Sequence, residues 1–375
     1  MRIIIIGEFS SFSKNLSEGF RQLEHECFVF SWGDNFKKIN QDSDNSYCIR
    51  QGQLSSKNLW KHIFFAFKSM ITSFKLQRKV CEMSKEQKWD VALVINPSFI
   101  RKKKAFWKPE FTQKMIESLL FNSSQIYFSA CGRDVPYYDF WKDQNWKNKE
   151  MISFGISSRY TSKEIHHLQS CLGFINKVIP VMYMYAEAWR RSEYTKNCKV
   201  LPTIPLPVDT SKFEEKNNIG VKIVIFHGII RPKDKGTPYI LDAMKRLQKK
   251  YPDEVECVAK GGMPLDEYLP LLNRTNILID QVYADSVGMN GLYALAMGKV
   301  VLGGNEPENQ KEFGECDCPI INIIPDADQI YAELEKLVKN PNLIKTLSVK
   351  SRVYVEKVHD AKTIAKKYID SFKNN

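Results

Sequence analysis

Residues 222–228 have the sequence Lys-Ile-Val-Ile-Phe-His-Gly, and a helical pattern follows over 237–250. The consecutive apolar residues predict a short strand that is buried on both faces, as strands are in a parallel sheet. Residues 2–7, Arg-Ile-Ile-Ile-Ile-Gly, repeat this pattern and precede a helical pattern over 16–23. Two such segments, far apart in the chain, predict two similar α/β domains rather than one extended sheet.

Short apolar segments alternate with helical patterns along both halves of the chain. This alternation is typical of βαβ crossovers, in which helices cover the faces of a parallel sheet. Further strands are expected at 27–30, 91–95, 125–129, 178–183, 255–259, 277–280, 300–302 and 320–324.

The domain boundary is predicted at residues 201–207, Leu-Pro-Thr-Ile-Pro-Leu-Pro. Its prolines resist a helix and favour an extended linker. Residues 342–372 have a helical pattern. We expect an N-terminal domain over 1–200, a C-terminal domain over 201–355, and a helix over 356–375 that packs back on the N-terminal domain.

The charge is distributed unevenly between the two halves of the chain. The net charge of the 375 residues is +12. Residues 1–200 hold 31 Lys and Arg against 19 Asp and Glu, whereas residues 201–375 hold 24 of each. A basic field of this kind attracts phosphates, anionic lipid or nucleic acid.

Composition and apolar runs indicate a soluble protein of a reducing compartment. Hydrophobic residues make up 43% of the chain and charged residues 26%. The apolar runs are too short for a spanning helix or a signal peptide. The nine cysteines are scattered without a C-x-x-C pair, which favours buried free thiols. We expect a cytoplasmic protein, at the inner face of the plasma membrane if its basic half binds lipid.

The first candidate ligand-binding segment covers residues 227–237, His-Gly-Ile-Ile-Arg-Pro-Lys-Asp-Lys-Gly-Thr. It leaves a buried strand, turns and enters a helix, whose first N–H groups and dipole favour anions. Arg231 and Lys235 add two cations, which suit a diphosphate and the charge on a departing nucleotide. The alternative is a solvated turn with ordinary surface charges.

The second segment covers residues 280–301. An apolar strand ends at Asp280, and a loop with Asp285, Ser286 and Gly288 leads into a helix of small residues. Glycine in such a loop allows the backbone to approach a ligand closely. The helix itself has a packing role, so a ligand role belongs to the loop.

These two segments, in this order, resemble the donor-binding half of GT-B glycosyltransferases, specifically glycosyltransferase family 4. Arg231, Lys235 and Gly236 are similar to the family's Arg…Lys-Gly element, and residues 293–301 to its "EAMAxGxPV" helix. Weaker similarities link residues 205–213 to its "NPVDxxxF" linker, 131–135 to its "HGxD" loop and 260–264 to its nucleobase loop.

The resemblance implies an α/β protein of the GT-B fold, with two Rossmann-like doubly wound domains that face each other across a cleft. It implies a retaining, hexosyltransferase-like reaction without a metal, with a nucleotide sugar as co-substrate and no other cofactor. The acceptor would be a glycan or a lipid-linked molecule, in bacterial surface polysaccharide or lipopolysaccharide assembly. The donor phosphate would act as the base, because the sequence offers no clear protein base.

The resemblance also implies roles for individual residues. The catalytic group is expected to be Arg231, Lys235 and Asp285. The acceptor is expected to contact Gly7, Ser10, Ser11, Gly132, Arg133 and Asp134. The donor is expected to contact His227, Gly228, Gly261, Gly262, Met263, Ser286, Gly288, Met289, Asn290, Gly291, Tyr293 and Glu306.

The chain departs from the family pattern at three positions. Members often carry two glutamates with seven residues between them, which align with Asp285 and Tyr293 here. Either the Tyr293 hydroxyl or Glu306 would then hold the donor ribose. The histidine of the N-terminal loop is replaced by Cys131.

Residues 57–80 form a separate amphipathic segment. Its apolar residues, Trp60 to Phe74, follow helical spacing, and Lys61, Lys68 and Lys75 recur on another stripe. A basic run over 101–104 follows with aromatic neighbours. One interpretation is a core-facing helix with a solvated outer face, and the other is a surface that contacts anionic membrane. Nucleic acid is not expected as a partner, because no recognised motif accompanies the charge.

Two other functions fit the same patterns. A GT-B-like nucleotide-sugar epimerase would need acid/base carboxylates and histidines facing the sugar. A non-catalytic sugar-binding or membrane-surface module would keep the fold without turnover. Among the histidines, His227 is expected as a packed strand end, and His25, His359 and the pair at 166–167 as surface residues rather than metal ligands.

Overall fold

A computed structural model provides the structure of the chain. It describes residues 1–31, 46–48, 88–96, 121–141, 161–175, 177–229, 232–315 and 317–374, together with single residues between 60 and 83. Among these residues, no helix is both long and apolar enough to cross a membrane.

The N-terminal domain is built on a seven-stranded sheet in which all strand pairs are parallel. The strand order is β3-β2-β1-β4-β5-β6-β7. Its strands are β1 (Arg2–Ile6), β2 (Glu26–Ser31), β3 (Ser46–Cys48), β4 (Trp89–Ile95), β5 (Ser123–Ala130), β6 (Lys177–Pro180) and β7 (Lys199–Val200). Its helices include α1 (Phe12–Gln22), α4 (Val135–Trp141), α6 (Ser162–Leu172) and α7 (Tyr183–Arg191).

Strand β1 is buried on both faces, as its apolar sequence predicts. Ile3 and Ile5 belong to one hydrophobic cluster and Ile4 and Ile6 to the other. The predicted strand 178–183 is shorter than expected, because β6 ends at Pro180 and α7 begins at Tyr183.

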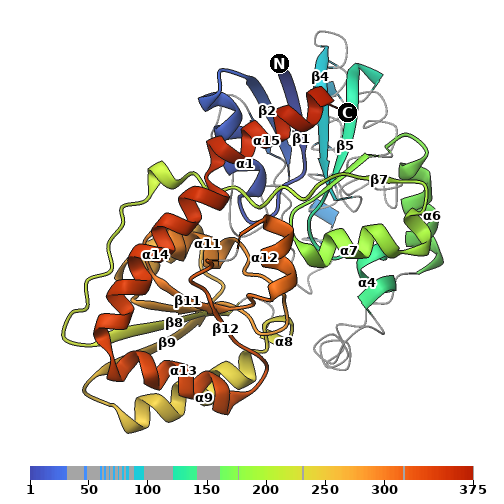
Figure 1. The fold of residues 1–375 in the computed structure, drawn as a ribbon. Helices are drawn as coiled ribbons and strands as arrows, with labels where there is room; N and C mark the ends of the chain where they lie inside the picture. Colours follow the sequence, from blue (N-terminus) through green and yellow to red (C-terminus); the bar gives the residue numbers. More distant parts are fainter. Residues whose placement is uncertain are drawn as a thin grey trace.

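The C-terminal domain has a five-stranded parallel sheet with the order β12-β11-β10-β8-β9. Its strands are β8 (Ile223–Ile229), β9 (Val255–Gly261), β10 (Ile277–Ile279), β11 (Val300–Gly303) and β12 (Ile321–Asn322). Its helices include α8 (Pro232–Lys235), α9 (Thr237–Lys250), α10 (Leu265–Arg274), α11 (Met289–Ala296), α12 (Pro307–Phe313), α13 (Ala327–Lys339) and α14 (Pro341–His359). The predicted fold class, two doubly wound α/β domains, is confirmed (Figure 1).

The strand orders identify where each sheet can hold a ligand. Successive strands are added on one side of β1 and then on the other, so the order reverses between β1 and β4. In the second sheet the reversal lies between β8 and β10. Doubly wound sheets bind ligands outside the carboxyl ends of the strands at this point.

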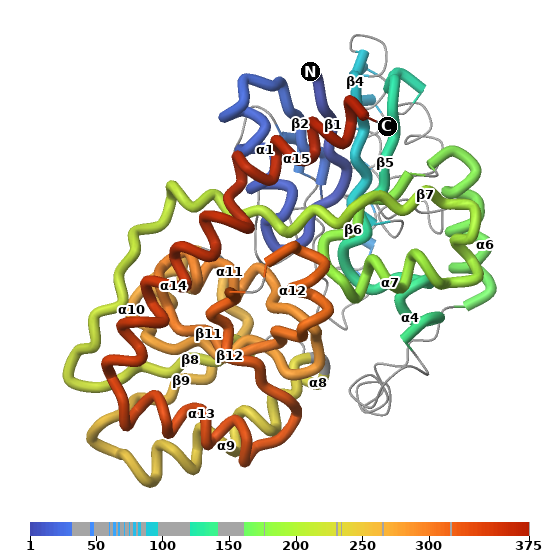
Figure 2. The backbone as a smooth tube through the Cα atoms, viewed as in Figure 1, coloured from blue at the N-terminus to red at the C-terminus, as the bar shows by residue number. Residues whose placement is uncertain are grey.

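The chain crosses between the domains twice, in the extended linker after β7 and between α14 and α15 (Ala361–Asn374). The two crossings are joined: the Val208 N–H donates to the His359 carbonyl at 2.7 Å, and the Ala361 N–H donates to the Val208 carbonyl at 2.8 Å. Helix α15 then packs on α1 of the N-terminal domain (Figure 2). A Cβ added at Gly19 would lie 2.1 Å from the Ala361 carbonyl oxygen, so α1 needs a glycine there.

His359 lies at this crossing, and its expected place on the surface is wrong. Only 3% of the residue is exposed, and its Nδ1–H donates to the Leu206 carbonyl at 2.8 Å. The ring packs against Phe313 and Tyr354. Burial lowers the pKa of His359 to about 4, so the ring is neutral at neutral pH.

Candidate functional site

The carboxyl ends of the two sheets face each other across the domain boundary. Asn15 on α1 donates from Nδ2 to the Tyr293 hydroxyl on α11 at 3.1 Å. At the start of α7, the Tyr183 N–H donates to Asn309 Oδ1 on α12 at 3.1 Å. Each of these helices follows a strand of its own sheet, so the contacts bring the two strand reversals toward one another.

A buried ion pair occupies the reversal point of the C-terminal sheet. Lys235 Nζ lies 2.7 Å from Asp280 Oδ1, with 9% and 2% of the side chains exposed. The same carboxylate accepts hydrogen bonds from Asn290 Nδ2 at 3.1 Å and the Gly288 N–H at 3.0 Å. Burial alone would raise the pKa of Asp280, but the Lys235 charge and these bonds hold it below its usual value.

This ion pair changes the interpretation of the predicted cations. Because Lys235 is buried, the alternative of an ordinary solvated charge is wrong for this residue. Its charge is balanced by Asp280, which the sequence indicated only as the end of a strand. Arg231, the second predicted cation, lies outside the described residues.

The turn before α9 depends on a glycine. Gly236 has φ of +67°, and a Cβ there would lie 2.2 Å from Val282 Cγ2. The next residue, Thr237, has its hydroxyl 2.9 Å from His227 Nε2, and His227 Nδ1 is 2.9 Å from the Ile279 carbonyl. The Nδ1–H therefore donates to the carbonyl and Nε2 accepts from Thr237.

His227 is fully buried, and burial lowers its pKa to about 4. Both of its ring nitrogens are occupied inside the protein. His227 is therefore packed at the end of its strand, as the sequence predicts. A contact between this residue and the donor stays a prediction.

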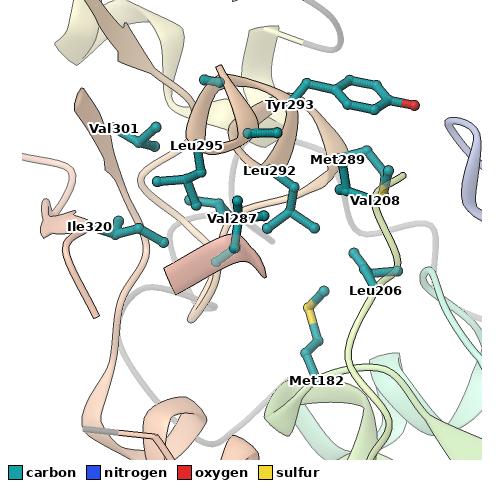
Figure 3. Packing of buried hydrophobic residues seen from close by; sticks show 14 of the residues in the cluster. Met182, Leu206, Val208, Val287, Met289, Leu292, Tyr293, Leu295, Val301 and Ile320 are labelled. Atoms are coloured by element: carbon teal, nitrogen blue, oxygen red, sulfur yellow. The ribbon is translucent and has the colours of Figure 1, made fainter. Parts of the chain in front are cut away.

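The loop before α11 is tightly packed against Gly291 of that helix and Gly304 after β11. A Cβ at Gly291 would lie 2.6 Å from Val287 Cβ, and one at Gly304 would lie 1.8 Å from the Ala284 carbonyl oxygen. Ser286 and Met289 are buried beside this loop. Figure 3 shows Val287 and Met289 in the apolar cluster that also contains Leu206 and Val208 of the linker.

Four further predicted donor contacts lie on strands β8 and β9 or directly after β9. Gly228 faces Asn290, whose Nδ2 would be 3.5 Å from an added Cβ. Gly261 lies against the Ile229 carbonyl, only 2.0 Å from an added Cβ, and Gly262 has φ of +70°. Met263 is half-buried and packs on the core.

Asp285 faces the N-terminal domain. Burial raises the pKa values of Tyr137 and Tyr183, and the Asp285 charge adds to both shifts. Arg133 opposes the shift of Tyr137, and its guanidinium lies 5.8 Å from the centre of that ring. The charges of Asp285 and Arg133 therefore shift the pKa of Tyr137 in opposite directions.

Tyr293 points out of the C-terminal apolar cluster toward α1 (Figure 3). Its hydroxyl is engaged by Asn15 and Ser11, and its ring packs on Phe213 at 5.2 Å. Burial raises the pKa of Tyr293 to about 12. The hydroxyl that was expected to hold a ribose therefore already bridges the two domains.

Glu306, the other residue expected to hold the ribose, lies beside the Asp285 loop. Its N–H donates to the Asp285 carbonyl at 3.0 Å, and its Oε1 accepts from Asn322 Nδ2 at 3.3 Å. The side chain stands at the start of α12, partly exposed.

The N-terminal loop after β1 has unusual backbone geometry. Gly7 has φ of +108°, and Ser10 and Ser11 have φ of +52° and +73°. Non-glycine residues rarely adopt positive φ, and such residues cluster at functional sites. The carboxylate of Glu8 is buried and accepts hydrogen bonds from the Ser13 and Lys14 N–H groups at 3.2 and 3.0 Å.

Glu8 and Asn96 were missed by sequence reasoning. Glu8 fills the N-terminus of α1, where the helix would otherwise favour an external anion. Asn96 follows β4 with φ of +71°, and its Nδ2 donates to the Cys131 carbonyl at 3.0 Å. The one feature of the sequence that could have indicated Glu8 and Asn96 is their position, because each directly follows an apolar strand or the glycine after it.

The loop 131–134 connects the acceptor-side residues to two helices. Gly132 has φ of +93°, and a Cβ there would lie 3.2 Å from the ring of Phe9. Asp134 accepts from the Tyr137 N–H and from Trp189 Nε1, both at 3.0 Å, so it links α4 to α7. Burial raises the pKa of Asp134 to about 7.

Solved structures cover the chain from end to end. Sucrose-phosphate synthase from Thermosynechococcus elongatus has a TM-score of 0.64 at 14% identity, over 100% of this chain and 99% of that one. Anabaena HepE with UDP and glucose has a TM-score of 0.58 at 10% identity, over 100% of both chains. TarM of S. aureus, a variant in complex with fondaparinux, alpha-GlcNAc-glycerol and UDP, has a TM-score of 0.60 at 12% identity, over 99% and 100%.

The chain has the GT-B fold. No protein-family model matches its sequence, and no curated protein sequence matches it significantly. At this level of identity the likeness concerns the GT-B architecture alone.

Proposed function

We propose that this protein is a glycosyltransferase that moves a sugar from a nucleotide-sugar donor to an acceptor. One observation carries the proposal: the buried Lys235–Asp280 pair lies at the strand reversal of the C-terminal sheet, and Asn15 of the N-terminal domain meets Tyr293 of the C-terminal domain across the boundary. Donor-side and acceptor-side groups must meet in this way for transfer. Structures of HepE in complex with UDP-glucose and of TarM with UDP and alpha-GlcNAc-glycerol, which share this fold, support it.

The donor is proposed to bind at the strand reversal of the C-terminal sheet. Lys235 donates one of its three N–H groups to Asp280, and the others are proposed to donate to a phosphate oxygen. The ion pair fixes the ammonium in place, so no reorganisation is needed as charge develops on the leaving nucleotide. Arg231 is proposed to supply the second cation.

Transfer is proposed to proceed with retention of configuration and without a metal. Asp285 would contact the donor sugar, and the acceptor would approach from the side of Arg133 and Gly132. The leaving phosphate would accept the proton of the acceptor hydroxyl. Water would be excluded by closure of the two domains, which meet at Asn15 and Tyr293.

The acceptor is proposed to be a glycan or a lipid-linked sugar in bacterial surface polysaccharide or lipopolysaccharide assembly, which would take place in the cytoplasm. The uneven charge supports this setting, since the basic half attracts phosphate-bearing acceptors.

The proposal is tested first by thermal shift against UDP-, GDP- and TDP-sugars, because a ligand of the folded state raises its melting temperature. Transfer to acceptors is then measured with the nucleotide sugar that binds. An epimerase would instead convert the donor without an acceptor, and a binding module would bind without turnover. Absence of a shift with all three nucleotide classes would contradict the proposal.

We predict that Asp285→Asn lowers kcat by about a hundredfold or more while donor binding persists, because a group that acts in the transition state is lost. Asp317→Asn is the matched control, since 81% of that side chain is exposed. Steady-state kinetics with the identified donor measure both. Equal kcat for the two variants would remove Asp285 from the mechanism.

A further inference from the structure

A tyrosine hydroxyl lies buried and unpaired at the carboxyl end of the C-terminal sheet. Tyr268 stands in the first turn of α10, which follows β9. The residue as a whole is partly exposed, but its hydroxyl oxygen is shielded from solvent and has no hydrogen-bond partner among the described residues. A buried hydroxyl that makes no hydrogen bond lowers stability, so such a group calls for an explanation. The sequence patterns assign no role to Tyr268.

The Tyr268 ring stands beside two residues that are expected to contact the donor. Its centre lies 5.8 Å from that of the Phe226 ring on β8. A Cβ added at Gly228 would lie 3.5 Å from Asn290 Nδ2 and 3.8 Å from Tyr268 Cε2. Because Cε2 is bonded to the ring carbon that carries the hydroxyl, the hydroxyl end of the ring faces Gly228. The missing side chain at Gly228 therefore leaves the end of β8 open beside both polar groups.

The carboxylate nearest in charge to this hydroxyl is already occupied. Asp280 accepts hydrogen bonds from Lys235, from Asn290 and from the Gly288 N–H, but not from Tyr268. Burial raises the pKa of Tyr268 well above its usual value, and the Asp280 charge adds to this shift. The hydroxyl therefore keeps its proton at neutral pH and remains a hydrogen-bond donor without an acceptor.

We propose that the Tyr268 hydroxyl donates a hydrogen bond to an oxygen of the nucleoside diphosphate part of the donor. The hydroxyl lies at the same strand end as Lys235, which is proposed to hold a phosphate oxygen. A nucleoside diphosphate carries oxygen acceptors along its length and thus supplies the partner that the protein lacks. Binding then satisfies a group whose desolvation has already taken place in the free protein. This inference rests on the proposed function, because it adds a residue to the donor site.

The first test compares the stability of the free proteins. Tyr268→Phe removes the hydroxyl alone, so the variant should melt at the wild-type temperature or above it, because an unpaired buried group is lost. The control is Tyr251→Phe before β9, at the amino end of the same sheet, where the hydroxyl donates to Glu335 Oε1 at 3.0 Å. This control should melt slightly below the wild type, because a formed hydrogen bond is lost.

Thermal unfolding without nucleotide measures all three proteins. A melting temperature of Tyr268→Phe as far below the wild type as that of the control would overturn the proposal, since the hydroxyl would then have a partner inside the protein.

The second test measures binding by calorimetric titration with UDP, GDP and TDP. For the nucleotide that the wild type binds, Tyr268→Phe should raise Kd by about tenfold, the usual size of a lost hydrogen bond to a ligand. Tyr251→Phe should leave Kd unchanged. In the transfer assay, Tyr268→Phe should raise KM for the donor and leave KM for the acceptor unchanged, a division that a merely structural role would not produce.

The outcomes separate this inference from the proposed function. Equal Kd values for the wild type and Tyr268→Phe would overturn the role of Tyr268 and leave the proposed glycosyl transfer in place. A wild type that binds none of the three nucleotides would overturn the proposed function and this inference together.

Discussion

At the scale of single residues, the Lys235–Asp280 ion pair is the buried charged contact of the candidate site. Two charges removed from water are tolerated only because they meet each other and further hydrogen-bond donors. Asp280 therefore stabilises the buried Lys235, whether or not it also contributes to ligand binding. A substitution of Lys235 is therefore expected to lower protein stability, and this effect has to be separated from any effect on nucleotide binding.

We predict that Lys235→Met lowers the free energy of unfolding by about 3–5 kcal/mol, because Asp280 is left buried without its counter-ion. Adding Asp280→Asn should restore a large part of this loss. Lys233→Met, on the exposed side of the same short helix, is the control. Urea denaturation of the four proteins measures the effect, and a stable single variant would mean that the pair is not buried in solution.

The sequence predicts Lys235 as a candidate site residue but does not predict that Asp280 is its partner. Lys235 stands in a turn between a strand and a helix, a pattern that local spacing reveals. Asp280 lies 45 residues further along the chain, and only the parallel pairing of β8 with β10 brings the two together. The same limit applies to Tyr293 and Asn15, whose contact spans the domain boundary over 278 residues of sequence.

At the scale of elements, the strands were the most predictable part of the fold. The apolar runs of β1 and β8 could only be buried, and they were expected at their observed positions. The helical pattern over 342–372 is divided between two helices, α14 and α15, with the break at Asp360. Nothing in the local sequence breaks it with glycine or proline. The break arises because Asp360 pairs with Val208 of the linker, a tertiary contact.

We predict a pH-dependent contribution from His359 at this break. The ring is held neutral, with a pKa of about 4 against 6.5 for the unfolded chain, so its contribution is complete above pH 6.5 and is lost as pH falls to 4. His359→Asn keeps an N–H donor for the Leu206 carbonyl but does not titrate.

The wild type should therefore lose roughly 3 kcal/mol more stability than His359→Asn between pH 6.5 and 4. Urea denaturation at several pH values measures both proteins. Comparison of the two isolates His359 from His227 and the other groups that titrate in both. Parallel profiles would show that His359 is solvated in solution.

At the scale of the whole molecule, each domain depends on segments from the far side of the linker. Helix α15 belongs to the end of the described chain but covers the N-terminal sheet. Phe372 is fully buried, 4.9 Å from the Tyr127 ring and 6.4 Å from the Phe20 ring. The two domains are thereby tied at Val208 and Ala361 as well as through the linker itself.

We predict that Phe372→Ala destabilises the N-terminal domain by about 3–5 kcal/mol, because it opens a cavity under α15. Amide exchange should accelerate in α1 and β5 and remain slow in α9 and β8. The control is Leu334→Ala on α13, also fully buried, which should produce the opposite distribution. Acceleration confined to the C-terminal domain in Phe372→Ala would contradict the packing described for α15.

The position of α15 also has a consequence for synthesis on the ribosome. Domains of most multidomain chains mature in the order in which they are translated. Here the half made first stays uncovered at Phe20 and Tyr127 until the half made second has emerged and delivered Tyr368 and Phe372. We therefore expect the nascent N-terminal half to expose this apolar surface throughout translation of the C-terminal half.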